Sequence, residues 1–137
     1  MNQFKGFPAG EIRFTSVPDL FFARLLPQID SLAELKVTLH FLWVHYRQTK
    51  QAISKNELLT DETLTQSLAL IDEDVERALL QGLERAVERG TRLYVQIENE
   101  EGQHDLYFLN SERGRQAQAK IKAGEIGVVA VSGLEVA

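Results

Sequence analysis

The residue types that most often carry chemistry are few in this chain of 137 residues, and their spacing is poor for joint action. The chain has no cysteine, which excludes disulfides, thiolate-bound metals and cysteine nucleophiles. His40 and His45 are five residues apart, so on one helix they face different sides and do not readily share a metal. His104 stands apart from both. The acidic runs at 72–74 and 100–101 lack the spacing of a calcium loop and indicate a helix start and a solvated turn.

Sequence motifs of catalysis are also missing. The chain has no glycine-rich phosphate loop and no hydrolase nucleophile elbow. We therefore expect a protein that is not an enzyme, with no catalytic residue, no metal and no cofactor. No apolar run approaches the roughly 18–20 residues that span a bilayer, and the start MNQFKGFPAG lacks a signal-peptide core. These features predict a soluble, cytoplasmic protein without a membrane partner.

The distribution of charge argues against strong DNA binding. The formal net charge is -5, whereas DNA-binding surfaces are generally basic because phosphate neutralisation supplies most of the affinity. The segment 72–90 carries six acidic and three basic side chains. The segment 112–122 is basic, which indicates either a solvated helix face or a weak phosphate contact. We expect DNA binding to be weak or absent, and the candidates for weak DNA contacts are Arg77, Arg85, Arg113, Arg115 and Lys120.

Capping residues and hydrophobic spacing predict the elements that position these side chains. A proline-led start at 15–19 predicts a helix that ends before Pro27. Ser31, with Glu34 as its capping-box partner, predicts a long helix to about Gln51. Ala52 and Ile53 fit a short strand. The capping box formed by Ser54 and Glu57 then predicts the next helix, and the segment 60–70 is partly helical with a break near Thr60.

The second half of the chain has clearer patterns. Residues 75–89 repeat apolar side chains at helical spacing and end at Gly90. Alternating residues over 93–98, a turn at 99–103 and a return strand over 106–109 predict a hairpin. Ser111 predicts the cap of a last helix, which ends at Gly124. The resulting fold class is mainly α with a small β-hairpin. The order of elements is that of a winged helix-turn-helix with an extra N-terminal arm and a C-terminal helix.

The N-terminal arm and the long helix carry more apolar side chains than one small domain readily buries. Five of the seven phenylalanines lie in the first 22 residues, so the arm over 1–16 must pack on its own domain or on a neighbouring chain. The long helix carries one apolar stripe with Leu32, Leu35, Leu39, Leu42, Trp43 and Tyr46, and a second with Ala33, Val37, Phe41 and Val44. Two stripes indicate a central helix that is covered either by its own chain or by a partner. Our candidates for an oligomer interface are Phe4, Phe7, Phe14, Val37, Phe41 and Val44.

Two runs resemble a known family. The run TSVPDLFFARLLPQIDSLAELKVTLHFLWVHYRQ is similar to the start of the N-terminal domain of DnaD replication-initiation (primosome) proteins. The later pattern DEDVERALLQGLERAVERG, LYVQIE and LYFLNS resembles the last winged-helix helix and the wing of the same family. The resemblance covers roughly 15–122, and the TSVP segment within the whole layout is what favours this family over other winged helices.

The resemblance implies a role in assembly. In that family the N-terminal winged helix self-associates, partly through extra N-terminal elements, and contacts other initiation proteins, while a separate C-terminal helical domain binds DNA. We therefore expect an arm over 1–16, a winged-helix domain over 17–123, and at 124–137 a tail, a linker toward a C-terminal domain absent here, or an extra strand. The predicted function is oligomerisation and docking in DNA replication, as a homodimer or higher homo-oligomer that binds other replication initiation proteins. The alternative is a winged-helix transcription regulator that binds DNA.

Overall fold

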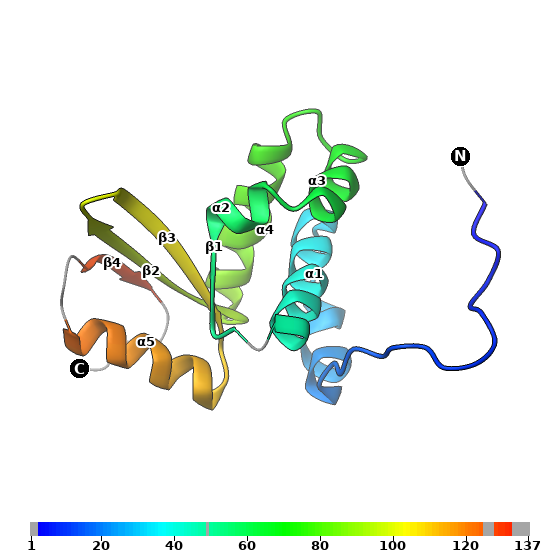
Figure 1. Ribbon diagram of the computed structural model, residues 1–137, viewed down its shortest axis with the longest axis horizontal. Coiled ribbons are helices and arrows are strands. Elements are labelled where there is room, and N and C mark those ends of the chain that lie inside the picture. The colour runs from blue at the N-terminus through cyan, green and yellow to red at the C-terminus, as the bar shows by residue number, and fades with distance from the viewer. Residues whose placement is uncertain (1–2, 49, 125–127, 133–137) are drawn as a thin grey trace.

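The chain folds as helices packed on a small antiparallel sheet (Figure 1). A computed structural model describes residues 3–48, 50–124 and 128–132. Its elements are η1 (Phe21–Leu25), η2 (Leu26–Gln28), α1 (Leu32–Gln48), β1 (Ala52–Ser54), α2 (Lys55–Leu59), α3 (Glu62–Ala69), α4 (Val75–Arg89), β2 (Arg92–Asn99), β3 (Gly102–Leu109), α5 (Glu112–Gly124) and β4 (Val128–Ser132). A helical chain with a β-hairpin is the coarse fold class that the sequence predicts.

Local capping sets most helix boundaries. The Ser54 hydroxyl accepts a hydrogen bond from the Glu57 N–H at 3.0 Å, and α2 begins there as predicted. The Asp74 carboxylate accepts the Arg77 N–H at 3.0 Å and starts α4. Gly90 ends α4 in the left-handed region, with φ 87°, where glycine has no side chain to clash. These boundaries were predictable because each depends on side chains within a few residues.

The segment before α1 departs from its prediction. Instead of an α-helix that stops before Pro27, residues 21–25 form a π-helical turn and residues 26–28 a 3-10 turn that contains the proline. Proline is tolerated there because the N–H it lacks has no helical partner at the start of a turn. Glu34 also departs from expectation. Its N–H donates to Ser31 at 3.2 Å, but its carboxylate binds Arg89 instead of closing the capping box.

The sheet has the strand order β1-β3-β2-β4, with all neighbours antiparallel. The β2–β3 hairpin is at its centre, with Arg92 opposite Leu109 at the open end. Because β4 pairs with β2, part of the segment predicted as a tail forms the extra strand. The rest of that segment, residues 125–127 and 133–137, lies outside the described residues.

The two faces of the hairpin pack against different helices (Figure 1). Leu93, Val95 and Phe108 form a small cluster that is covered by Ala117 and Ile121 of α5. The alternate residues face the main core between α1, α3 and α4, where Tyr107 is buried. This alternation follows from the period of two in a strand. The sheet therefore separates α5 from the helical layer.

The main core depends on a close approach of α1 and α4. A Cβ atom added to Gly82 would lie 2.8 Å from both the Ala33 carbonyl oxygen and the Val37 side chain. Glycine is therefore required for the two helices to pack at this distance. The two helices are further joined by the ion pair of Glu34 with Arg89, which has distances of 2.6 Å and 3.0 Å.

Arg92 is a buried cation at the junction of β2 and α1. Its Nη2 donates to the Thr38 carbonyl oxygen at 2.8 Å, and its guanidinium lies 3.6 Å from the centre of the Phe41 ring. Burial lowers the pKa of Arg92 to about 9, so the guanidinium still carries its charge at neutral pH. The ring contact is a cation–π interaction, which is strongest when the cation is desolvated.

Candidate interaction surface

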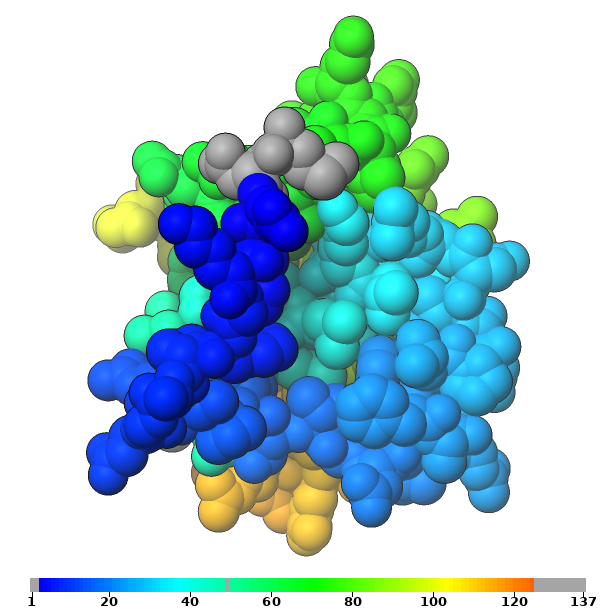
Figure 2. Space-filling view, turned by 90° about the vertical axis from the view of Figure 1, so that its right-hand side faces the viewer, coloured from blue at the N-terminus to red at the C-terminus, as the bar shows by residue number. Residues whose placement is uncertain are grey.

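The N-terminal arm is aromatic and exposed. Phe4, Phe7 and Phe14 have between 70% and 82% of their surface accessible. Phe4 and Phe7 pack edge-to-face on each other, with ring centroids 5.1 Å apart. The arm extends away from the helical layer (Figure 1), and it stands in front of the rest of the molecule when that side is viewed (Figure 2). The sequence left open whether the arm packs on its own domain or on a neighbouring chain. These three rings do not pack into the core of their own domain.

Helix α1 presents a second apolar strip, which we call the α1 stripe. It consists of Leu32, Leu39 and Tyr46, which are seven residues apart and so lie on one side of the helix. Between 39% and 51% of the surface of each is exposed. Leu35 and Trp43 lie between them and are half-buried. A surface helix normally buries its apolar side chains, so this stripe is a candidate contact surface.

For three residues, the prediction that they form an oligomer interface is wrong. Val37 and Phe41 are fully buried within the subunit and Val44 is 9% exposed, so none of them is available to a partner. The helical spacing identifies both stripes of α1 but does not say which one packs inward. The Ala33–Val37 side is narrow enough to fit against Gly82, and it forms the core. The sequence signal that could have identified the inward side is the match between the small side of α1 and Gly82 on α4.

A groove connects the arm to the α1 stripe. It has a volume of about 410 Å³ and is lined by Arg13, Phe14, Thr15, Trp43, Tyr46 and Arg47. The Arg47 guanidinium lies 5.0 Å from the centre of the Trp43 ring, within the range of a cation–π contact. Because Phe14 and Tyr46 line the same groove, the end of the arm and the α1 stripe meet there. We call the two together the arm–α1 surface, defined by Phe4, Phe7, Phe14, Leu32, Leu39 and Tyr46.

The arginines of α4 that were candidates for DNA contacts are paired with acids of the same chain. Arg77 binds both carboxylate oxygens of Asp72 at 2.8 Å, and Arg85 lies 3.3 Å from Asp30. Hydrogen bonds from Arg77 are the main cause that lowers the pKa of Asp72 to about 2. Paired guanidiniums have less charge to offer to phosphates, and this weighs against the DNA-binding alternative.

The basic side chains of α5 lie away from α4. Arg113 and Lys120 are exposed, and Arg115 donates to the Asn110 side chain at 3.1 Å. Since α5 covers the face of the sheet that is turned away from α4 (Figure 1), the structure does not bring the two groups of cations together on one DNA-binding face.

The histidines have local partners. His40 contacts Asp61 at 2.9 Å, His45 contacts the Lys50 carbonyl oxygen at 2.8 Å, and His104 contacts Asn99 at 3.2 Å. Among the described residues, no group of three or more His, Asp or Glu side chains is placed to hold a metal ion. Within the same residues, no helix combines the length and apolar character that crossing a membrane requires.

Comparisons of the chain with family models, with curated proteins and with solved structures found no match. The surfaces described above and the sequence resemblance are therefore the basis of the proposed function.

Proposed function

We propose that this protein is a non-enzymatic assembly module that self-associates through the arm–α1 surface. The observation that carries the proposal is the exposure of six large apolar side chains on the arm and on α1, which meet at the groove that Phe14 and Tyr46 line. Apolar patches of this kind on a folded domain generally mark contacts with other proteins. A twofold dimer is the simplest arrangement because it covers the same patch on both copies at once.

We further propose a winged-helix architecture and a DnaD-like role in DNA replication initiation, with docking of other initiation proteins. The support is the element order. A short strand β1 precedes two helices, and α4 leads directly into the β2–β3 hairpin, which pairs with β1. In this interpretation α4 corresponds to the recognition helix and the hairpin to the wing. The resemblance of residues 15–48 to DnaD proteins supports the proposed family.

The experiment is sedimentation velocity of the full chain, with Leu39→Glu as the test variant. Leu39 is 39% exposed, so its burial contributes about 1 kcal/mol per copy and about 2 kcal/mol per dimer. This corresponds to a rise of roughly thirtyfold in the dimer dissociation constant, before repulsion between the two new carboxylates is added. We expect a dimer or larger species for the unaltered chain and a shift toward monomer for Leu39→Glu.

The matched control is Leu70→Glu, which makes the same change at a leucine that is 82% exposed outside the arm–α1 surface. It should leave the sedimentation coefficient unchanged. A monomer at tens of micromolar for the unaltered chain would overturn the proposal. An equal effect of the two substitutions would place the contact elsewhere.

A further inference from the structure

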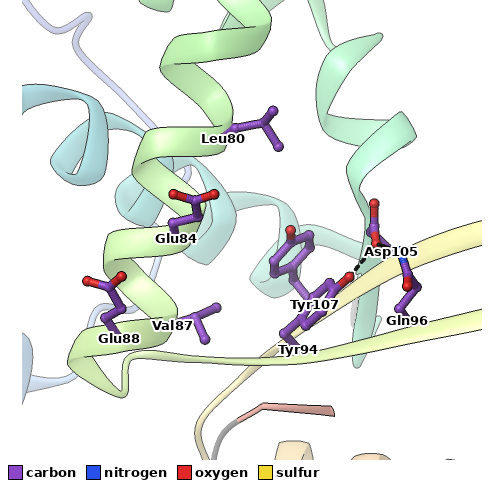
Figure 3. A pocket seen from close by; sticks show the side chains of 8 residues that line it. All are labelled: Leu80, Glu84, Val87, Glu88, Tyr94, Gln96, Asp105 and Tyr107. Atoms are coloured by element: carbon purple, nitrogen blue, oxygen red, sulfur yellow. Dashed lines mark hydrogen bonds between the residues drawn. The ribbon is translucent and has the colours of Figure 1, made fainter. Parts of the chain in front are cut away.

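A second groove lies between α4 and the hairpin, on the side of α4 that faces the sheet (Figure 3). Its volume is about 400 Å³. It is lined by Leu80, Glu84, Val87 and Glu88 from α4 and by Tyr94, Gln96, Asp105 and Tyr107 from the two strands. The hairpin leads away from α4 (Figure 1), so the helix does not cover this part of the sheet. We call this feature the acidic groove.

The strand wall of the acidic groove is a hydrogen-bonded unit. Asp105 accepts a hydrogen bond from the Tyr94 hydroxyl at 2.5 Å and a second from the Gln96 side chain at 3.1 Å (Figure 3). Both donors lie opposite or near Asp105 in the antiparallel register. The carboxylate is therefore held in place at the wall before any ligand arrives, which reduces the entropy lost on binding.

The helix wall supplies two further acids. Glu84 and Glu88 are exposed and four residues apart, one helical turn, and both line the groove. Its lining, as far as the structure describes it, includes three carboxylates and no basic side chain. The bases of α4 are paired with acids outside the groove: Arg77 with Asp72, Arg85 with Asp30 and Arg89 with Glu34. The negative charge of the groove is therefore not balanced from within it.

We infer that the acidic groove binds an arginine-bearing peptide segment of a partner protein. A guanidinium stacks on aromatic rings and pairs with carboxylates through two parallel N–H donors. The half-buried Tyr94 provides the ring, with the buried Tyr107 packed beside it, and Glu84, Glu88 and Asp105 provide the carboxylates. Leu80 and Val87 provide an apolar strip for an aliphatic neighbour of that arginine.

The charge of the acidic groove favours a peptide over DNA as its ligand. In a winged helix, α4 and the hairpin are the elements that approach DNA, but a groove with three carboxylates repels phosphates and attracts cations. The acidic groove and the arm–α1 surface lie on opposite sides of the α1–α4 pair (Figure 1). Binding here is therefore independent of the proposed self-association.

The test measures the fluorescence anisotropy of a fluorescein-labelled, amidated twelve-residue peptide, with four arginines and two leucines, on addition of the full chain. We expect saturable binding that weakens as salt is raised from about 50 to about 300 mM, because the contact is electrostatic. The same peptide with lysine in place of arginine should bind more weakly. The double substitution Glu84→Gln with Glu88→Gln should weaken binding by about tenfold.

The matched control is Glu73→Gln with Glu100→Gln, which removes the same charge at two exposed positions outside the acidic groove. It should change the affinity less than twofold. Equal weakening by both pairs would show attraction by net charge alone and overturn the proposal, as would saturable binding of a DNA duplex at the same residues. Amide chemical-shift mapping on the unaltered protein gives a readout without any substitution, and shifts that avoid Tyr94, Asp105 and Tyr107 would also refute it.

Discussion

Replacing Glu34 with glutamine tests the contact that joins α1 to α4. The Glu34 side chain is fully buried and binds Arg89 at 2.6 Å and 3.0 Å. The substitution keeps the shape of the side chain but removes its charge, which leaves the guanidinium without its anion. Removing one partner of a buried ion pair costs about 3–5 kcal/mol.

The expected loss lies near the lower end of this range. The Arg89 side chain is 20% exposed and stands in the last turn of α4, where the helix dipole favours a cation. The free energy of unfolding of Glu34→Gln should therefore fall by about 3 kcal/mol. Urea unfolding followed by fluorescence measures it, because Trp43 is the single tryptophan of the chain.

Two further variants make this prediction refutable. Glu88→Gln makes the same chemical change at an exposed position of α4 and should alter the unfolding free energy by less than about 0.5 kcal/mol. In a double-mutant cycle, Glu34→Gln combined with Arg89→Met should cost less than the sum of the two single changes, because each already removes the same ion pair. A loss below about 1 kcal/mol for Glu34→Gln, or strict additivity in the cycle, would refute a buried ion pair between these helices.

Three other predictions follow from close contacts and from a shifted pKa. Gly82→Ala should lower the free energy of unfolding by about 1–3 kcal/mol, although alanine favours helices, because its Cβ would lie 2.8 Å from the Ala33 carbonyl oxygen; equal or higher stability in urea would contradict the close packing. Gly114→Ala should lower the free energy of unfolding more than Gly82→Ala does, since its Cβ would lie 1.8 Å from the last carbonyl oxygen of β3. A melting temperature within a degree or so of the unaltered value would be incompatible with this contact. The Asp72 carboxyl should titrate by NMR with a pKa of about 2, below the ordinary aspartate value of 3.8, and Arg77→Ala should raise that pKa. Because the pKa of Asp72 is lowered in the folded state, its ion pair with Arg77 stabilises the fold above pH 3.8, and this stabilisation is lost as the pH falls through 2. An unshifted pKa of Asp72 in the unaltered protein would disprove the contact.

Local interactions explain why much of the secondary structure could be predicted. Ser54, Asp74 and Gly90 end or begin helices through contacts within a few residues, and the alternation around Gly102 specifies the hairpin. The sequence predicted that the arm packs on its own domain or on a neighbouring chain, and the structure leaves Phe4, Phe7 and Phe14 exposed on the subunit. Phe4, Phe7 and Phe14 accordingly remain in the candidate surface.

Contacts between residues that are distant in the chain were decided only by the tertiary structure. The periodicity of α1 defines two apolar stripes, but only the fit of Val37 against Gly82 determines that one is core and the α1 stripe is exposed. The capping-box spacing of Glu34 is equally valid whether its carboxylate turns back to Ser31 or reaches Arg89, 55 residues away. Side-chain periodicity is a property of one helix, whereas burial depends on which other surface it meets, and that surface exists only once the chain has folded.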